Sequence, residues 1–528
     1  MDKKNSNAFI YATIVAMGGF LFGLDAVLIS GTLDFLKTEF GLSSLEVGTA
    51  ASAPALGVLI ALPFAGWISD RFGRKKAILL VAILYLVSAL GSAFAPSFEF
   101  LVAARFLGGL AFSSITLASM YIGEIAPPVW RGKLVSMTQI NIVIGLSGAY
   151  FVNYFILDLA KSDAAWVSRY AIDSQTWRWM LGAEVPFALL WFFLLFRIPE
   201  SPYWLVLRNR LEDAKKTLRR IYDEDKIEPH ITEMRESLEK STGGGSIGAQ
   251  FKEIFSSPMR LTLIIAFTIA IAQQATGINA ILVYAPTVFQ QLGGGENAAF
   301  SQAVWVGLTA LVFTVFGLLL VDKIGRRPLI IGGLIWVVLS LGISSYAFKQ
   351  ARYTFSSDDF AELSKNVAEE KTEFDGLDRL NALVDVEYQS DIEFKDAIAE
   401  VLGEKDAETH QNMLVEKSLN MNATLVLVCI LSVVAAFHIS IGPLMWVLFS
   451  EIFPISIRGL AIPLFAIISS LINWVVQQFF PWQLENQGMS GIFLTYGAVV
   501  AVGLVVLFFT LRETKGMTIE EIQAAFRS

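Results

Sequence analysis

Long apolar stretches recur along the whole chain of 528 residues, and they limit what it can fold into. Examples lie at 78–94, 181–196, 261–272 and 491–511. A helix needs about 20 mostly apolar residues to cross a bilayer, and in lipid the backbone must satisfy its own hydrogen bonds. Only 17% of the residues are charged, against about 25% in soluble domains. The chain is therefore predicted to be an all-α membrane protein.

Hydropathy predicts twelve transmembrane helices, six before the middle of the chain and six after it. The first six lie near residues 8–32, 47–69, 76–95, 99–123, 134–157 and 179–197. The second six lie near residues 260–291, 300–321, 328–348, 423–449, 459–481 and 489–511.

The short loops indicate on which side of the membrane the helix ends lie. Lys and Arg follow the second span (71–76), the fourth (131–133), the eighth (323–327) and the tenth (Arg458). Positively charged loops are retained on the cytoplasmic side. With twelve spans all four loops fall on one side, so we expect both termini in the cytoplasm. We expect a multi-pass plasma-membrane protein, in the inner membrane of a bacterium.

A cytoplasmic connector of about residues 200–258 separates the two sets of spans. Apolar residues recur at helical spacing over 205–222, with basic residues around them, which predicts one amphipathic helix. The run 241–246 (STGGGS) has the composition of a flexible linker. We expect helices that brace the two halves; a solvated connector is the alternative.

An acidic insertion at about 349–420 interrupts the second set of spans. It holds 8 Lys and Arg against 18 Asp and Glu, a balance of −10, whereas the whole chain has a net charge of −8. The topology places it outside the cell. Apolar residues at helical spacing over 377–384 and 394–402 predict a small helical cap. A cap that selects substrate and a solvated lid without such a role both remain open.

Two motifs occur twice, once in each half of the chain. Residues 70–75 (DRFGRK) correspond to 322–327 (DKIGRR), and 124–132 (EIAPPVWRG) to 451–459 (EIFPISIRG). The first pair is offset by 252 residues and the second by 327, as the printed sequence shows. The difference, 75, is about the length of the acidic insertion. Removing the insertion brings the halves into register, so the chain is predicted to contain an internal duplication.

Each repeated motif places acids and arginines at helix ends on the cytoplasmic side. Carboxylate–guanidinium pairs are strong when partly desolvated, and a rigid shift can separate them. We expect them to latch the two halves together when the protein faces outward; anchoring of helix ends at the lipid headgroups is the alternative. The expected gating residues in the motifs are Asp70, Arg71, Arg74, Glu124, Arg131, Asp322, Arg326, Glu451 and Arg458.

With these motifs the chain resembles the sugar porter family of the major facilitator superfamily, along almost its whole length except the insertion. Further matches are 199–205 (PESPYWL), 512–516 (RETKG) and, most specifically, 273–279 (QQATGIN). Tyr203 and Arg512 depart from the family's usual Arg and Pro. The resemblance implies two six-helix bundles, 1–199 and 259–528, with the substrate site between them near mid-membrane. It also adds Glu200 to the gating residues.

Asp25 in the first span and Arg105 in the fourth are ionisable residues inside the membrane, which makes them functional candidates. In proton-coupled members of the family the matching Asp carries the proton, and its pairing with Arg changes during transport. Burial favours the neutral acid and a nearby guanidinium favours the carboxylate, so moving the Arg away would switch proton affinity. Facilitators of the family generally lack this acid. A permanent structural ion pair is the alternative.

The resemblance also implies the residues that bind sugar. The amides Gln139, Gln273, Gln274 and Asn279 match the family's polar ligands, and Trp446 matches its aromatic contact. Amides that only join helices to one another are the alternative. The pocket departs from the family pattern at several positions, which should change the substrate that fits. These positions are Leu146, Val283, Ala310, Ser469 and Ser470.

These features predict a proton-coupled monosaccharide symporter that works by alternating access. A passive sugar facilitator, a proton-coupled carrier of a polyol such as inositol, and a sugar sensor that does not transport are the alternatives. No enzyme activity, cofactor or metal is expected, since the three histidines are scattered and the Gly243–Gly245 run lacks the Lys of a phosphate-binding loop. The expected partners are a sugar, a proton and the lipid bilayer, with no nucleic acid, and we expect a monomer.

Overall fold

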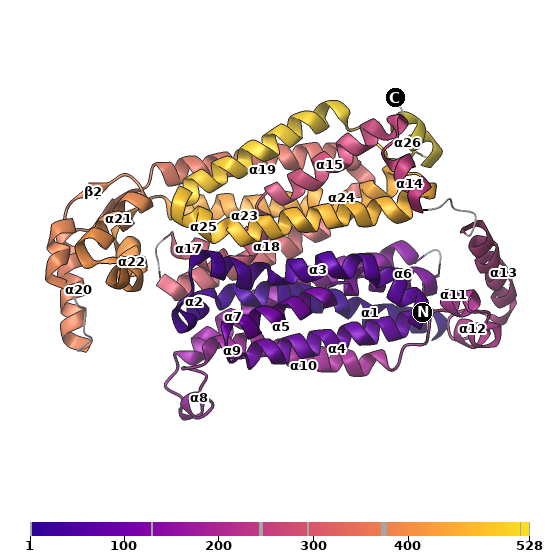
Figure 1. Ribbon diagram of the computed structural model, residues 1–528, viewed down its shortest axis with the longest axis horizontal. Coiled ribbons are helices and arrows are strands. Elements are labelled where there is room, and N and C mark those ends of the chain that lie inside the picture. The colour runs from indigo at the N-terminus through magenta and orange to yellow at the C-terminus, as the bar shows by residue number, and fades with distance from the viewer. Residues whose placement is uncertain are drawn as a thin grey trace.

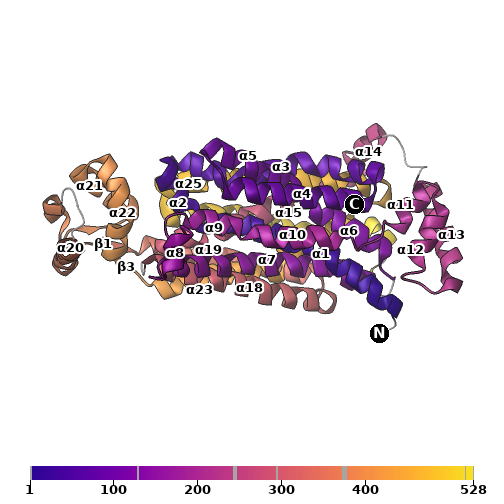
Figure 2. The ribbon, with the colours of Figure 1, turned by 90° about the horizontal axis from the view of Figure 1, so that it is seen from below.

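The computed structural model describes residues 3–127, 130–241, 247–292, 295–370, 377–517 and 519–526. Long helices run side by side in two bundles, one from each half of the chain (Figure 1). The acidic insertion projects from one end of the bundles, here called the insertion end. The connector and both labelled chain ends lie at the opposite end, here called the terminal end (Figure 2).

The N-terminal bundle contains six spans, two of which are interrupted. Short elements at the insertion end are η1 (Ile29–Gly31), α2 (Leu33–Phe40) and α8 (Ala165–Arg169). The spans are α1 (Lys3–Leu28), α3 (Ser44–Phe72), α4 (Arg74–Ala93), α5 (Phe98–Ala111) with α6 (Ser114–Ile125), α7 (Arg131–Ala160), and α9 (Thr176–Gly182) with α10 (Glu184–Leu195).

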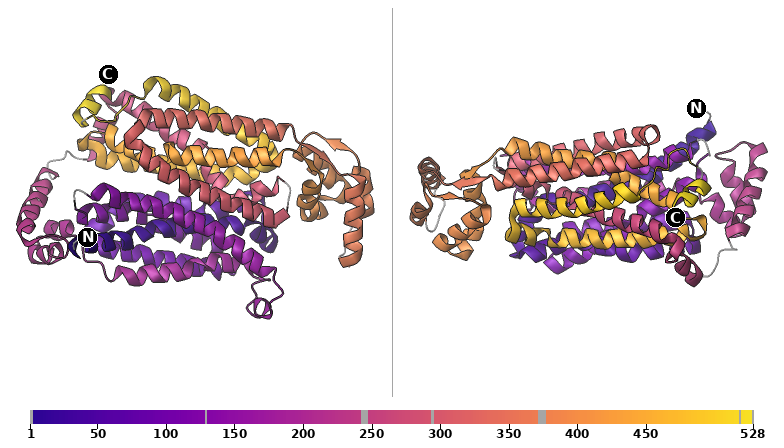
Figure 3. Two further views of the ribbon diagram at one scale, coloured as in Figure 1. Left: turned by 180° about the vertical axis from the view of Figure 1, so that it is seen from behind. Right: turned by 90° about the horizontal axis from the view of Figure 1, so that it is seen from above.

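The C-terminal bundle repeats this pattern, as the view from behind shows (Figure 3). A turn of 3-10 helix, η2 (Ser257–Met259), leads into it, and α26 (Ile519–Phe526) follows it. The spans are α15 (Arg260–Ala275) with α16 (Ile278–Val283) and α17 (Ala285–Gln290), α18 (Gly295–Ile324), α19 (Arg326–Lys349), α23 (Ala423–Ile439) with α24 (Ile441–Ile452), and α25 (Ile455–Thr510).

The described residues contain eleven helices long and apolar enough to cross a membrane. The last of them covers 55 residues, Ser456–Thr510, which is too long for one span. Its backbone turns at Gly488, where φ is 62°, a conformation that glycine adopts without steric cost. The long element is therefore two spans, and the predicted total of twelve is confirmed.

Close packing of α1 against α7 holds the N-terminal bundle together. A Cβ atom at Gly23 would collide with the backbone of Ile142, and one at Gly145 with that of Phe20. Glycines let two helix backbones approach closely in a membrane, where van der Waals contact replaces the hydrophobic effect as the source of association. This packing fixes α1, which carries Asp25, relative to the rest of the bundle.

The connector differs from the single helix expected over 205–222. It forms α11 (Pro202–Leu207), α12 (Leu211–Leu218), α13 (Glu224–Ser241) and α14 (Ile247–Ile254). Asn209, with φ of 55°, lies in the turn that follows the first of these helices. The apolar spacing that predicted a single helix therefore runs across a break between two helices. Leu207 consequently is exposed, while Leu218 and Ile231 share a small core. The glycine run of the expected linker, 242–246, lies outside the described residues.

The insertion folds around its own apolar core, which includes Phe355, Leu380, Phe394 and Ile398. Its helices are α20 (Ser357–Glu370), η3 (Leu377–Leu383), α21 (Asp391–Leu402) and α22 (Glu404–Ser418). The insertion is thus mainly helical, as predicted, and three short antiparallel strands that were not predicted join the helices in the order β2-β1-β3. These strands are β1 (Arg352–Thr354), β2 (Glu387–Tyr388) and β3 (Leu419–Asn420).

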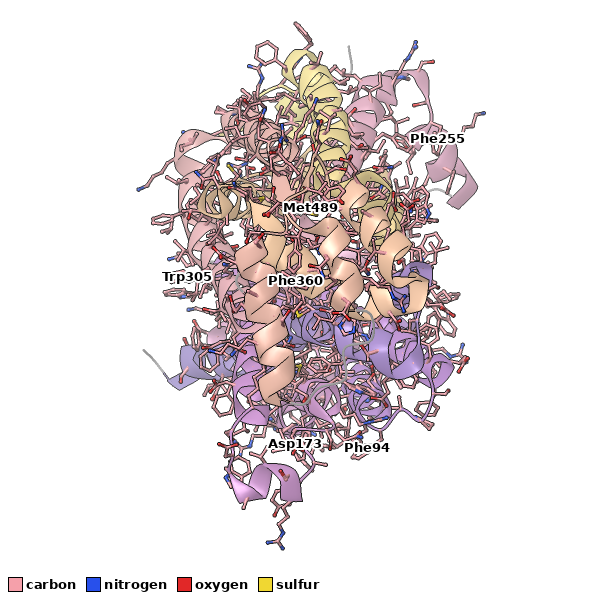
Figure 4. All side chains as sticks on the ribbon, turned by 90° about the vertical axis from the view of Figure 1, so that its left-hand side faces the viewer. Phe94, Asp173, Phe255, Trp305, Phe360 and Met489 are labelled. Carbon is pink, nitrogen blue, oxygen red and sulfur yellow. The ribbon has the colours of Figure 1, made fainter. Side chains whose placement is uncertain are left out.

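The insertion lies across the insertion end of the molecule. Viewed from that end, α20 with Phe360 lies in front of the bundles and runs from the C-terminal bundle toward the N-terminal one (Figure 4). Near Met489 the insertion meets the turn of α25. A cavity of about 120 Å³ lies at this junction, lined by residues that include Gln291, Lys349, Tyr353 and Gly488.

Candidate functional site

Asp25 on α1 and Arg105 on α5 form an ion pair inside the N-terminal bundle. The guanidinium of Arg105 donates to the Asp25 carboxylate and also to the Asp25 backbone carbonyl, at 3.2 Å. The two residues are 1% and 2% exposed. Charges in an apolar interior are kept only when they are paired, so the structure brings together the two residues that the sequence singled out.

Glu184, the first residue of α10, is a third ionisable group in this cluster, and it was not predicted from the sequence. It is 3% exposed and lies close enough to Asp25 and Arg105 for both charges to act on it. The signal was available, because Glu184 is a lone acid inside a predicted span, which is the criterion that identified Asp25.

The cluster is incompletely satisfied in hydrogen bonding. Among the described residues, Asp25 Oδ2, Arg105 Nε and Glu184 Oε1 are buried without a partner. Two carboxylates and one guanidinium carry a net charge of −1 when all three are ionised. A proton bound to either acid would remove this charge and supply a hydrogen-bond donor, so the cluster has the composition of a proton-binding site.

Because Gly108 on α5 has no side chain, the carboxylate of Asp25 fits closely against its backbone. A Cβ atom there would lie 2.7 Å from Asp25 Oδ2 and 2.6 Å from the Ser88 hydroxyl. We expect Gly108→Ala to lower the free energy of unfolding by about 1–3 kcal/mol, the usual cost of overpacking. Thermal unfolding of the purified protein measures this.

Gly123→Ala on α6 is the control, because a Cβ atom there meets nothing within 4 Å. The control should be neutral or slightly stabilising, since alanine favours helix more than glycine does. Equal unfolding midpoints for the two variants would show that Asp25 does not need the space.

Three of the predicted sugar-binding amides form a connected row in the C-terminal bundle. Gln274 Nε2 donates to Gln273 Oε1 at 3.1 Å, and Asn279 Nδ2 donates to Gln274 Oε1 at 2.7 Å. Gly277, with φ of 72°, breaks the span between α15 and α16 and so lets the row continue across the break. The row offers both donors and acceptors at a point where the helix is discontinuous.

The row also reaches the break in the neighbouring span. Gln273 Nε2 donates to the backbone carbonyls of Ile441 at 3.4 Å and Gly442 at 3.2 Å, at the start of α24. Trp446, one turn further along α24, is 43% exposed and its ring meets that of Phe449 edge-on. The predicted aromatic contact therefore lies on the helix that the amide row touches.

Gln139 is half-buried on α7, in the other bundle. Its neighbour Thr138 packs against Gly19 of α1. The structure thus assigns four of the predicted sugar-binding residues to the C-terminal bundle and one to the N-terminal bundle.

At the terminal end of the N-terminal bundle, Arg74 is 3% exposed and is bound by two of the predicted gating acids. It donates to Glu124 at 2.8–3.0 Å and to Asp70 at 2.7 Å. Ser201 also donates to Glu124. Glu200 accepts from the backbone N–H of Lys75 at 3.1 Å. We call these residues the Arg74 cluster.

The C-terminal bundle holds a copy of this cluster, here called the Arg326 cluster. Arg326 binds Glu451 at 3.1 Å and Asp322 at 3.2 Å, and Thr514 donates to Glu451 at 2.6 Å. Glu513 accepts from the backbone N–H of Arg326 at 3.0 Å. Glu513 and Thr514 thus repeat Glu200 and Ser201, a correspondence that was not predicted from the sequence.

Three of the predicted gating arginines take other positions. Arg71 lies over the rings of Trp67 and Phe72, and Arg458 donates to the backbone carbonyl of Phe453. Arg131 is exposed at the start of α7. Each cluster is formed within its own bundle in this conformation.

The two bundles are joined toward the insertion end by contacts that we call the seam. Gly48 of α3 packs against the backbone of Gln478 on α25. The hydrogen bonds of the seam include Gln290 to Asp34 (2.9 Å), Gln478 to the Leu45 carbonyl (2.8 Å), Ser52 to Gln478 (2.7 Å), Lys161 to Glu296 (2.7 Å) and Ser147 to the Gly307 carbonyl (2.7 Å).

Comparisons with known proteins give consistent results. A family model described as "Sugar (and other) transporter" matches residues 11–357 and 409–526. The D-xylose-proton symporter of Escherichia coli K12 is 30% identical over 99% of this chain and 97% of its own length. The arabinose-proton symporter of Bacillus subtilis 168 is 28% identical, over 99% and 96%.

Solved structures are similar as well. The inward open conformation of the xylose transporter XylE from E. coli superposes with a TM-score of 0.72 at 28% identity, over 98% of this chain and 99% of that one. XylE bound to 6-bromo-6-deoxy-D-glucose gives a TM-score of 0.68 at 28% identity, over 99% and 100%.

Proposed function

Since this chain belongs to the sugar transporter family, with the major facilitator fold, we propose that it carries a monosaccharide together with a proton by alternating access. The observation that carries the proposal is that one bundle holds the buried cluster of Asp25, Arg105 and Glu184 and the other holds a row of amides. The relatives named above as sugar–proton symporters support it.

The proton is held by the acid cluster. When Asp25 is ionised, Arg105 pairs with it and holds it in place on α1. Protonation removes the attraction, so Arg105 is free to pair with Glu184 and α1 is free to move relative to α5. Because a buried charge is tolerated only when it is paired, the proton changes which arrangement of these helices is stable.

The sugar is bound by the amide row and Trp446. Amides supply both donors and acceptors for hydroxyl groups, and an aromatic ring covers the C–H face of a sugar. Gln273 links the row to the break before α24, so a sugar bound to Gln274 and Asn279 would influence two discontinuous spans. Gln139 of the other bundle would close the site when the bundles approach.

We further propose that the terminal end is cytoplasmic, and that the acidic insertion 349–420 lies outside. The positively charged loops at the terminal end support this orientation. In this orientation the seam closes the outer side, and the conformation faces inward. The carrier is then divided into bundles at 1–199 and 259–528, joined by the connector 200–258.

Transport into proteoliposomes tests the function. Sugar added outside weakly buffered vesicles should make the external medium more alkaline if protons enter with it. Sugar uptake without any pH change would indicate a passive facilitator instead, and the absence of uptake would contradict transport. A competition panel of pentoses, hexoses and polyols identifies the substrate class.

We expect Gln274→Ala to raise the half-saturating sugar concentration. Gln274 bonds both of its neighbours in the row, so its loss removes a ligand and releases Gln273 and Asn279. One hydrogen bond contributes about 0.5–1.5 kcal/mol, which corresponds to roughly a 2- to 13-fold change in affinity. Initial uptake rates at varied sugar concentration measure it.

Asn486→Ala is the control for this variant, because the Asn486 amide bonds the Trp482 carbonyl of its own helix and is exposed. An unchanged half-saturating concentration in Gln274→Ala would remove the amide row from the sugar site.

A further inference from the structure

A carboxylic acid bridges the seam at its outer edge. Asp34 on α2 of the N-terminal bundle accepts a hydrogen bond at 2.9 Å from the Gln290 amide, at the end of α17 in the C-terminal bundle. Asp34 is half-buried between Leu33 and Leu36, which are 2% and 0% exposed. The contact is between bundles, so it exists only while the insertion end is closed.

We propose that Asp34 is a second proton-binding site of this carrier, and that its proton stabilises the closed seam. The site is separate from the cluster of Asp25, Arg105 and Glu184, because it lies on the surface between the bundles. The inference rests on the proposed function and orientation in one respect only, namely that the proton comes from outside.

The charges around Asp34 leave its carboxylate poorly compensated. Lys37, one turn along α2, pairs with Glu485 of the other bundle at 4.0 Å. Glu296, at the start of α18, acts on Asp34 as a like charge and pairs with Lys161 at 2.7 Å. The partner that crosses the seam to Asp34, Gln290, is neutral. An ionised Asp34 is therefore costly in the closed seam, and a protonated one is not.

The pKa of the Asp34 carboxyl is consistent with this arrangement. Burial raises the pKa above its ordinary value and Glu296 adds to the rise, while Gln290 and Lys37 oppose it without cancelling it. Opening the seam would separate Asp34 from Gln290 and expose it to water, so its pKa would return toward the ordinary value.

The sign of the effect follows from this difference. The state with the higher pKa binds the proton more tightly, so acid favours the closed seam. The stabilisation is complete below the ordinary pKa of an aspartic acid and is lost as the pH rises through the raised value. Each unit of pKa difference changes the ratio of closed to open molecules about tenfold.

Such a site would tighten the coupling of transport. The outer medium that protonates the acid cluster would also protonate Asp34 and favour closure of the outer side. At high external pH both acids would be ionised, and a carrier without its proton would be less able to close and turn inward. The Asp34 site thus acts against uncoupled passage of sugar.

The test measures the width of the seam, so it does not depend on transport. Spin labels at Phe94 and Tyr346, which are 75% and 64% exposed on different bundles, report the distance across the insertion end. The protein is studied in lipid nanodiscs between pH 4 and pH 8, in an Asp25→Asn, Cys429→Ala background. This background removes the titration of Asp25 and the native thiol.

We expect low pH to raise the fraction of molecules with a closed seam in the background protein. Asp34→Asn should remove most of this pH dependence, and its seam should remain closed throughout the pH range. Asn is neutral, like the protonated acid, and can still accept from Gln290. Glu485→Gln is the matched control, because Glu485 crosses the same seam but its side chain is 53% exposed. Its pH dependence should persist, with a midpoint at or slightly below that of the background protein, because Lys37 is then released toward Asp34.

The proposal would be overturned if Asp34→Asn still closed with acid at an unchanged midpoint. It would also be overturned if Glu485→Gln lost as much of the pH dependence as Asp34→Asn does. Should Asp34→Asn not fold, Gln290→Glu decides. A second carboxyl facing Asp34 should move the midpoint to higher pH, and an unmoved midpoint would overturn the proposal. If the seam responds to pH as expected but added sugar does not make the external medium of the proteoliposomes more alkaline, the result would count against the proposed function alone.

Discussion

Asp25→Asn is expected to abolish accumulation of sugar against a gradient while leaving exchange of sugar across the membrane intact. A proton moving down a difference of one pH unit supplies about 1.36 kcal/mol, enough for a tenfold sugar gradient at one proton per sugar. Asn binds no proton, so the internal and external concentrations should become equal. Proteoliposomes with an imposed pH gradient measure accumulation, and counterflow of labelled sugar measures exchange.

Asp163→Asn is the control, since Asp163 is an exposed acid in a loop of the same bundle. It should accumulate sugar as the unmodified protein does. Accumulation that survives in Asp25→Asn would move the proton site elsewhere in the cluster, and Glu184→Gln would then become the decisive variant. Loss of exchange as well as accumulation would indicate that Asp25 holds the bundle together and does not itself couple proton to sugar.

Glu124→Ala is expected to destabilise the protein by about 3–5 kcal/mol, the cost of leaving a buried charge without its partner. Arg74 is 3% exposed and makes three hydrogen bonds to Glu124, which is its more buried partner. Asp70, at 2.7 Å, would remain, but its side chain is 58% exposed, so it compensates the buried charge only weakly. Glu451→Ala should have a smaller effect, because the Arg326 side chain is 16% exposed against 4% for Arg74. Thermal unfolding of the two variants measures the difference.

Arg71→Ala provides the control for the Arg74 cluster. Arg71 lies over exposed aromatic rings at the same helix end, where a cation contributes about 0.5–1 kcal/mol. Equal destabilisation by Arg71→Ala and Glu124→Ala would contradict the assignment of a buried, paired charge to Arg74.

Much of the fold followed from the sequence, because a bilayer allows few solutions. Twelve apolar spans and two repeated motifs predicted two related halves of six spans each, and the family resemblance implied that each half forms a bundle. Gly488 marks the turn between the last two spans, which otherwise form one continuous helical element. The sheet of the insertion was missed because strands of two or three residues are too short to show an alternating pattern. The connector was predicted as one helix because the apolar spacing continued across the turn at Asn209.

The candidate site was partly predictable as well, because the bilayer also limits where charged residues can occur. Asp25 and Arg105 are visible because a charge inside an apolar span is conspicuous, and Glu184 should have been found in the same way. Glu513 was harder to find, because it follows Glu200 by 313 residues, an offset that neither repeated motif shares. The contact between Asp34 and Gln290 joins residues 256 positions apart and depends on the conformation, so no sequence pattern reports it.

The pairing of the strands at the start and the end of the insertion has an evolutionary consequence. β1 pairs with β3, with Arg352 opposite Asn420, so the chain leaves and rejoins the carrier at neighbouring points. The family model resumes its match at residue 409 after stopping at 357, on either side of most of this module. A unit with its own core and adjacent ends can be gained, lost or exchanged in a lineage without disturbing the surrounding helices. The same position is a natural place for an engineer to graft a foreign domain.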